Sequence, residues 1–153
     1  LYRWKSSRDD ILSVLTLKAS AVDFFFEEIE PIPIDSSAIE NWYKKVCSSE
    51  HHQLEHVSII FCNDEYLLDM NRSYLSHDYY TDIITFDISE ESQVIEGELY
   101  ISLDRVRENA DAVSASFESE LHRVLIHGVL HLMGYLDKSD SDQKIIHKFF
   151  LCN

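Results

Sequence analysis

The chain has few basic residues for its length. Among its 153 residues, 13 are Lys or Arg and 28 are Asp or Glu, so its formal net charge is −15. A protein that holds nucleic acid by general electrostatics usually carries a basic stripe, and this sequence has none. If the substrate is a polyanion, local groups or a bound cation must therefore overcome the repulsion.

Cysteines and long apolar runs are also scarce. Cys47, Cys62 and Cys152 are an odd number at wide spacing, which excludes a disulfide framework and a Cys-x-x-Cys metal clip. We therefore expect a reducing, cytoplasmic location. No apolar run approaches the roughly 20 residues that cross a bilayer, so no membrane partner is expected. Hydrophobic residues make up 45% of the chain, which is enough for a buried core and excludes wholesale disorder.

The first 20 residues differ from the rest of the chain. Basic residues precede a short apolar run from Leu12 to Leu17, as in a signal peptide, but Asp9 and Asp10 interrupt the junction. We expect residues 1–20 to be an N-terminal extension, with secretion as the less favoured alternative, and residues 21–153 to form one domain.

Apolar periodicity predicts the secondary structure of that domain. Alternation and β-branched or aromatic content predict four strands, at Val22–Glu28, Val57–Cys62, Ile83–Ile88 and Gly97–Leu103. Helical spacing predicts four helices: one capped by Asp35 or Ser36 and continuing to Val46, one capped by Asp64 and continuing through Met70, one from Asp104 through Val113, and one from Phe117 to Leu132. The prediction is an α+β fold, with a mostly mixed sheet of about four strands packed with four to five helices.

The clearest chemical signal is a pair of histidines near the end of the last predicted helix. His127 and His131 are four residues apart, so a helix would stack both imidazoles on one face within reach of one metal ion. Gly134 can end the helix in a left-handed conformation, and this turn would bring Asp137 back toward the imidazoles. Two nitrogen ligands and one oxygen ligand with open positions are typical of catalytic zinc, although nickel, cobalt and manganese accept the same ligands.

The same spacing occurs in one group of metalloproteases. Those enzymes have Glu directly after the first His, where it acts as general base. Gly128 occupies that position here. The ordinary peptidase mechanism therefore lacks its base.

Three separate motifs, in one order, carry a resemblance to a known family. The segment from His127 to Tyr135 resembles the signature H-G-x-L-H-L-x-G-Y, and Gly97 to Ser102 resembles G-D-I-x-I-S. Upstream, Asn71-Arg72-Ser73-Tyr74 and then Thr81 to Phe86 resemble Asn-x-x-Tyr followed by T-D-V-L-S-F. Over residues 22 to about 146, the chain resembles the YbeY-type endoribonucleases, which are ribosomal RNA maturation factors.

This resemblance implies a zincin-like, metalloprotease-type fold and a metal-dependent endoribonuclease specific for single-stranded RNA. The implied role is late ribosomal RNA processing at the 3′ end of the small-subunit rRNA, together with ribosome quality control. The implied partners are ribosomal RNA and a ribosomal particle or small-subunit ribosomal protein, with no DNA. The implied ligands of one Zn²⁺, which are catalytic through that ion, are His127, His131 and Asp137, and the implied substrate-binding residues are Asn71, Arg72, Tyr74, Thr81 and Asp82.

Two positions depart from the family pattern. Asp137 stands where the family usually supplies a third His, although a carboxylate is also an acceptable zinc ligand. Leu75 stands where the family usually has an Arg that is thought to handle substrate phosphate. Arg72 could replace it, but an ordinary exposed charge is the favoured interpretation.

The remaining histidines predict no second metal site. His51, His52 and His56 are interpreted as exposed residues of a polar loop, and His77 as a loop residue with substrate contact as the alternative. His122 is five residues before His127, a spacing that points it away from the metal face.

Two other functions remain open at this point. One is a non-catalytic, zinc-stabilised ribosome-assembly factor that binds rRNA or a basic ribosomal protein, which the acidity of the chain favours. The other is a metallohydrolase acting on a small substrate, because a catalytic metal site does not name its substrate.

Overall fold

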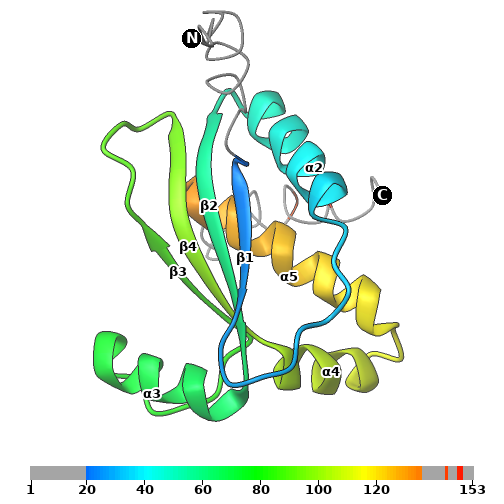
Figure 1. Cartoon of the computed structure of the whole chain (residues 1–153). Coiled ribbons are helices and arrows are strands. Elements are labelled where there is room, and N and C mark those ends of the chain that lie inside the picture. The colour runs from blue at the N-terminus through cyan, green and yellow to red at the C-terminus, as the bar shows by residue number, and fades with distance from the viewer. Residues whose placement is uncertain (1–19, 136–143, 145–147, 150–153) are drawn as a thin grey trace, which may run out of the picture.

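The computed structural model describes residues 20–135, 144, 148 and 149. Most of the predicted N-terminal extension, together with Asp137, His147 and Cys152, lies outside these residues. The elements are β1 (Val22–Phe26), α2 (Ser36–Ser49), β2 (Gln53–Cys62), α3 (Asp64–Leu75), β3 (Ile83–Asp87), β4 (Val94–Ser102), α4 (Leu103–Ala112) and α5 (Phe117–Leu132) (Figure 1). The predicted α+β fold with a four-stranded sheet is confirmed.

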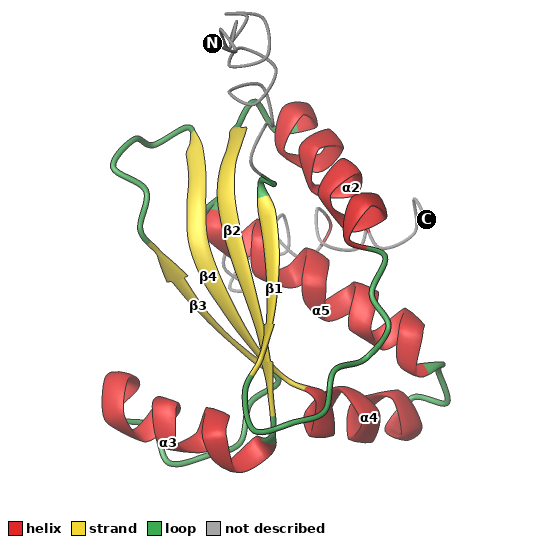
Figure 2. Ribbon diagram, in the orientation of Figure 1, coloured by secondary structure: helices red, strands yellow, loops and turns green. Residues whose placement is uncertain are grey.

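The sheet is mixed, as predicted, and has the strand order β1-β2-β4-β3 (Figure 2). Strands β1, β2 and β4 are parallel to one another, and β3 runs antiparallel to β4, with Ile83 paired to Ile101 and Asp87 to Gly97. Because β3 is last in the strand order, it is an edge strand of the sheet.

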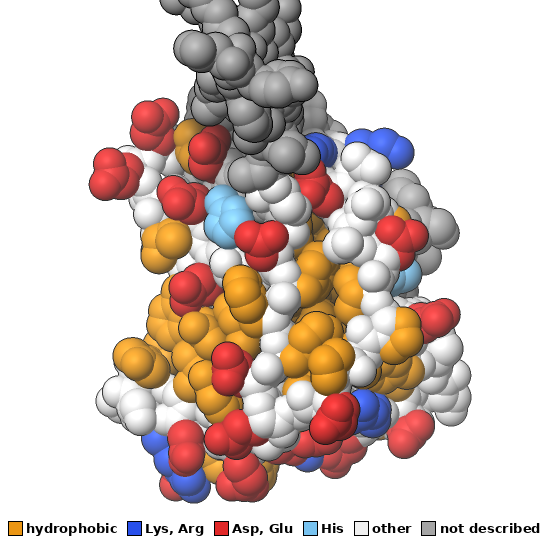
Figure 3. Space-filling view, viewed as in Figure 1, with side chains coloured by type: hydrophobic (Ala, Val, Ile, Leu, Met, Phe, Trp, Pro, Cys, Tyr) orange, Lys and Arg blue, Asp and Glu red, His pale blue; other side chains and the backbone are white. Residues whose placement is uncertain are grey.

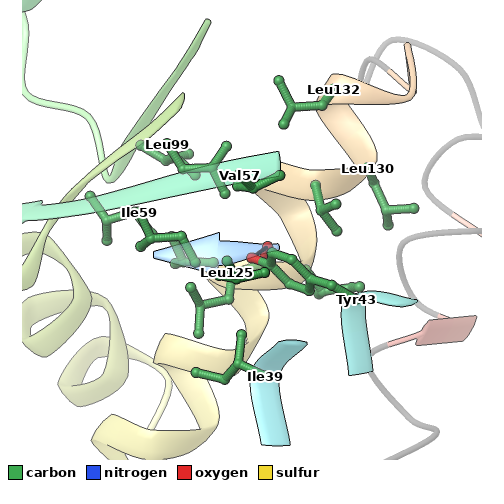
Figure 4. Close-up of a cluster of buried hydrophobic side chains, with 14 of the residues drawn as sticks. Ile39, Tyr43, Val57, Ile59, Leu99, Leu125, Leu130 and Leu132 are labelled. Atoms are coloured by element: carbon green, nitrogen blue, oxygen red, sulfur yellow. Dashed lines mark hydrogen bonds between the residues drawn. The ribbon is translucent and has the colours of Figure 1, made fainter. Parts of the chain in front are cut away.

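Helices α2 and α5 cover one face of the sheet, and the main core lies between the sheet and these two helices (Figure 4). Leu99 and Leu125 are fully buried there. The Tyr43 hydroxyl donates a 2.7 Å hydrogen bond to the carbonyl oxygen of Leu125, which joins the two helices. The opposite face is covered in part by α3, which contributes Leu67 to a smaller cluster with Cys62 and Ile84.

Local sequence explains most of the element boundaries. Helix α5 has the predicted bounds, because the Ser116 side chain accepts a hydrogen bond from the backbone N–H of Ser119 and closes its first turn. Helix α2 is capped by Asp35, one of the two predicted caps. Helix α3 is capped by Asn63 and not by Asp64, and it continues to Leu75.

Two strands begin earlier than predicted. Strand β2 begins at Gln53, four residues before the predicted start, because its first residues pair with β4 around a bulge. His56 therefore lies in a strand, and the prediction that it lies in a loop is wrong. Strand β4 likewise begins at Val94, before the predicted Gly97.

Two glycines allow α5 to lie close against the sheet. A Cβ atom at Gly97 would lie 2.7 Å from the carbonyl oxygen of Phe86 and 2.8 Å from Leu132 Cδ2. A Cβ atom at Gly128 would lie 2.6 Å from Ile83 Cδ1. These contacts place the C-terminal half of α5 directly against β3 and β4. None of the helices in the described part of the chain has the length and apolar composition needed to span a bilayer.

Candidate functional site

The structure brings the two predicted imidazole ligands together on α5. The ring centroids of His127 and His131 are 4.1 Å apart, with 49° between the ring planes. The Nδ1 atom of His127 and the Nε2 atom of His131 are buried. Neighbouring imidazoles on one helix face suit Zn²⁺ and other divalent metals that accept nitrogen ligands, so these two residues fit the predicted metal.

The third predicted ligand, Asp137, lies outside the described residues. Within them, no group of three or more His, Cys, Asp and Glu side chains is arranged to hold a metal ion. The chain leaves α5 through Gly134, whose φ of +89° is the left-handed conformation that the sequence predicts. The Gly134 N–H donates to the His131 carbonyl oxygen at 2.9 Å, which closes the last turn.

Tyr135 fixes the segment that follows α5. Its hydroxyl donates a 2.7 Å hydrogen bond to Glu50 Oε2, at the C-terminal end of α2. The other oxygen of that carboxylate, Oε1, lies 3.5 Å from Lys148 Nζ. The residue two positions before Asp137 is thus tied to the neighbouring helix.

Arg123 joins α5 to the start of β3. Its guanidinium donates to both carboxylate oxygens of Glu120, with Nε at 3.0 and 2.9 Å, and its Nη2 lies 2.9 Å from Asp82 Oδ2. The hydrogen bond to Glu120 is the main cause that raises the pKa of Arg123 above its ordinary value, while burial opposes this shift. Sequence reasoning missed Arg123, although Glu and Arg three residues apart, one turn before His127, were a usable signal.

Asn71 and Thr81 shape the segment between α3 and β3. The Asn71 side chain is 2% exposed, and its Nδ2 donates a 2.8 Å hydrogen bond to the carbonyl oxygen of Tyr79. The backbone carbonyl oxygen of Asn71 accepts a hydrogen bond from the backbone N–H of His77 at 3.1 Å. The Thr81 hydroxyl donates to the carbonyl oxygen of Ile83. A cavity of about 240 Å³ lies beside these residues.

The two remaining predicted substrate-binding residues are exposed. Arg72 Nε lies 2.6 Å from Asp78 Oδ1 and its Nη1 lies 3.5 Å from Asp69 Oδ1, so its charge is met by two carboxylates. Tyr74 is 69% exposed and contacts Phe86 edge to face, with centroids 5.8 Å apart, on the sheet face opposite α5. The structure therefore does not bring Tyr74 to the two histidines.

Three other histidines of the described segments contact groups outside this pair. His122 is on α5 but contacts Trp42 of α2, with centroids 5.8 Å apart, as its spacing predicts. His56 Nε2 lies 3.7 Å from Asp23 Oδ2, and His52 Nδ1 lies 2.8 Å from the carbonyl oxygen of Glu50.

Comparison with known proteins places the chain in a family. The family model described as Endoribonuclease YbeY matches residues 25–149. The chain belongs to the YbeY family. A curated YbeY endoribonuclease from Cytophaga hutchinsonii is 44% identical over 130 residues, which cover 85% of this chain and 91% of that protein. The Porphyromonas gingivalis YbeY endoribonuclease is 47% identical over 122 residues, 80% of each chain. The resemblance predicted from the three motifs is confirmed.

A solved structure has a similar fold. The solution structure of a protein from Thermotoga maritima superposes with a TM-score of 0.59 at 27% sequence identity. The match covers 84% of this chain and 86% of the other.

Proposed function

We infer that this YbeY-family protein is an endoribonuclease, a hydrolase that cleaves internal phosphodiester bonds of RNA. The inference is supported by curated relatives that bear this name, among them three at 44–47% identity over most of the chain. The alternative of a non-catalytic assembly factor is not favoured, because these relatives are named as enzymes. The same names favour RNA over a small substrate.

We propose that the substrate is single-stranded ribosomal RNA, cleaved in the cytoplasm near the 3′ end of the small-subunit rRNA. The motif resemblance supports this role, as it does a part in ribosome quality control. On the face shown in Figure 3, acidic side chains are widely distributed and basic side chains are sparse. Because such a surface repels free polyanions, we propose that a ribosomal particle or a basic small-subunit ribosomal protein presents the RNA.

We propose that one Zn²⁺ is held by His127, His131 and Asp137. The support is the 4.1 Å separation of the two imidazoles and the chemistry of the donors, which nickel, cobalt and manganese also accept. When bound, a divalent ion supplies Lewis acidity that activates water and offsets the charge of an RNA phosphate.

The protein's own residues hold this site in position. Arg123 couples α5 to the residue before β3, one turn before His127. Gly128 sets the approach of the same helix to Ile83. The Arg123 charge is already engaged by Glu120 and Asp82, so we assign Arg123 to positioning and not to phosphate binding.

The single observation that carries this proposal is the His127 and His131 pair within a family signature. The test compares cleavage of a labelled single-stranded RNA by the wild type and by His131→Ala, with metal content measured in parallel. His122→Ala is the matched control, since His122 lies on the same helix and contacts Trp42. We expect His131→Ala to lose bound metal and at least about 100-fold in cleavage rate, with His122→Ala unchanged.

Activity retained by His131→Ala would show that the assigned site is wrong. Repeating the assay with ribosomal particles and with free RNA tests the proposed presentation of the substrate. Faster turnover on particles supports it, and equal turnover contradicts it.

A further inference from the structure

The molecule has a cavity that the histidine pair does not line. The 240 Å³ cavity is bounded by the C-terminal end of α3, by residues 76–82 and by the edge strand β3. Its walls combine the apolar side chains of Leu75 and Ile83 with the polar side chains of Asn71 and Thr85, and two aromatic rings line it, those of His77 and Tyr79. Apolar walls with a few polar groups are typical of small-ligand sites.

The two rings that line the cavity are held in place. The rings of His77 and Tyr79 are stacked, with centroids 5.2 Å apart and 23° between their planes. The Tyr79 hydroxyl lies 3.2 Å from His77 Nδ1, and the backbone of both residues is bonded to the buried Asn71. Tyr79 nevertheless remains 57% exposed. A fixed but exposed aromatic ring can bind a flat ligand with little loss of entropy.

The next residue, Tyr80, differs from Tyr79 in its contacts. The Tyr80 hydroxyl donates a 2.7 Å hydrogen bond to Glu65 Oε1, and the guanidinium of Arg105 lies 5.1 Å from the centre of its ring. Tyr80 does not line the cavity. Tyr80 is therefore engaged by α3 and α4, whereas Tyr79 lines the cavity.

One residue links the cavity to the helix that carries the histidine pair. Ile83 lines the cavity, and the Cδ1 atom of the same side chain approaches the backbone of α5 at Gly128, next to His127. Ile83 is therefore a residue shared by the wall of the cavity and the contact of β3 with α5 beside His127.

In the described part of the chain, the arginine charges of α3 and α5 are already engaged by carboxylates. Leu75 carries no charge, Arg72 is paired with Asp78 and Asp69, and Arg123 is paired with Glu120 and Asp82. Stacking of a base on an aromatic ring requires no positive charge and is tolerant of sequence. An acidic protein can bind single-stranded RNA in this way.

We propose that this cavity is a nucleobase subsite, in which one unpaired base of the RNA substrate stacks on Tyr79, supported by His77. This inference rests on the proposed function, because it takes RNA as the substrate. It assigns to Tyr79 a substrate-binding role that contributes to affinity without sequence selection.

The first test compares four proteins: the wild type, Tyr79→Ala, Tyr79→Phe and the matched control Tyr80→Ala. Binding of a fluorescein-labelled single-stranded 12-mer RNA is followed by anisotropy, and cleavage gives kcat and KM separately. Loss of one stacked base corresponds to roughly a 5- to 100-fold weaker Kd. We expect such a loss for Tyr79→Ala, seen in Kd and KM with kcat within about twofold, while Tyr79→Phe and Tyr80→Ala bind like the wild type.

The second test replaces one nucleotide of the RNA at a time by an abasic nucleotide. We expect one position at which the wild type loses affinity and Tyr79→Ala loses nothing further, because both changes remove the same stacking contact. Equal binding by Tyr79→Ala and the wild type, or the same abasic penalty in both, overturns the subsite. Absence of cleavage with an intact abasic pattern would instead overturn the proposed enzymatic function, so the two failures are distinguishable.

Discussion

The guanidinium of Arg123 lies 2.9 Å from the carboxylate of Asp82, and this contact joins the helix of the histidine pair to the residue before the edge strand. The same guanidinium compensates the carboxylate of Glu120, whose side chain is only 6% exposed. Arg123 therefore ties α5 to β3 while it also neutralises a buried charge.

Replacing Arg123 should destabilise the fold. Arg123→Met leaves the Glu120 carboxylate buried without its cation, and we expect a loss of about 2–3 kcal/mol in the free energy of unfolding, measured by urea denaturation. The pKa of Arg123 is raised in the folded protein, so the ion pair contributes fully to the free energy of unfolding at any pH below the ordinary pKa of arginine. This contribution should therefore be the same at pH 7 and at pH 9. Combining Arg123→Met with Glu120→Gln should restore part of the loss, and a loss under 0.5 kcal/mol for Arg123→Met alone would contradict this role.

Gly97 of β4 and Gly128 of α5, which lie where the helix contacts the sheet, should differ in their tolerance of a methyl group. At Gly97 the added Cβ meets the carbonyl oxygen of Phe86, which is part of the sheet and cannot move alone. At Gly128 it meets the end of the Ile83 side chain, and alanine gains about 1 kcal/mol in helix propensity. We expect Gly97→Ala to cost about 2–3 kcal/mol and Gly128→Ala about 1 kcal/mol or less, measured by thermal or urea unfolding. The reverse order would show that the contact of α5 with the sheet is not as described.

The buried thiols should make stability depend on alkaline pH. Burial raises the pKa of Cys47 to about 12 and that of Cys62 to about 12. The unfolded chain ionises these thiols near pH 8.5, whereas the folded chain keeps them protonated, so stability falls between about pH 9 and pH 12 by up to about 1.4 kcal/mol per pH unit for each thiol.

Serine at each position tests this prediction. In a Cys152→Ser background, Cys47→Ser and Cys62→Ser should each flatten the decline, as followed by urea denaturation at several pH values. Neither native thiol should react with a thiol reagent at pH 8. Rapid labelling of the folded protein would contradict the assigned burial.

Removing the Tyr135 hydroxyl should weaken the metal centre that we propose. Tyr135→Phe loses the hydrogen bond to Glu50 and with it the tether of the segment that leads to Asp137. We expect about 1 kcal/mol lower stability and about 10-fold weaker Zn²⁺ binding in a competition titration with a chelating dye. Unchanged Zn²⁺ affinity, with the stability loss present, would limit Tyr135 to a structural role.

The sequence predicted the elements well where local signals are strong. Helix α5 was predicted with its observed bounds from its apolar spacing, and the structure adds the cap Ser116 at its start. The start of β2 was not predicted, because Gln53 and His56 join the strand through pairing with β4 and not through an apolar pattern. The strand order and the direction of β3 depend on contacts between distant segments, which periodicity does not encode.

The candidate site was predictable only where it depends on the local spacing of residues along one helix. The spacing of His127 and His131 along one helix fixes their proximity, and the structure places their rings together. The partner of Asp82 is 41 residues away in the sequence, so no local pattern indicated its ion pair with Arg123. Asn71, predicted to bind substrate, is buried and bonded to the backbone of Tyr79, a role that depends on the path of the intervening loop. The roles predicted for the site residues in metal and substrate binding stay predictions.

The most direct test of the account is cleavage of single-stranded RNA by the purified protein before and after removal of its metal. The account predicts that a chelator abolishes cleavage and that one equivalent of Zn²⁺, or another accepted divalent metal, restores it. Cleavage at an undiminished rate in metal-free buffer would contradict it.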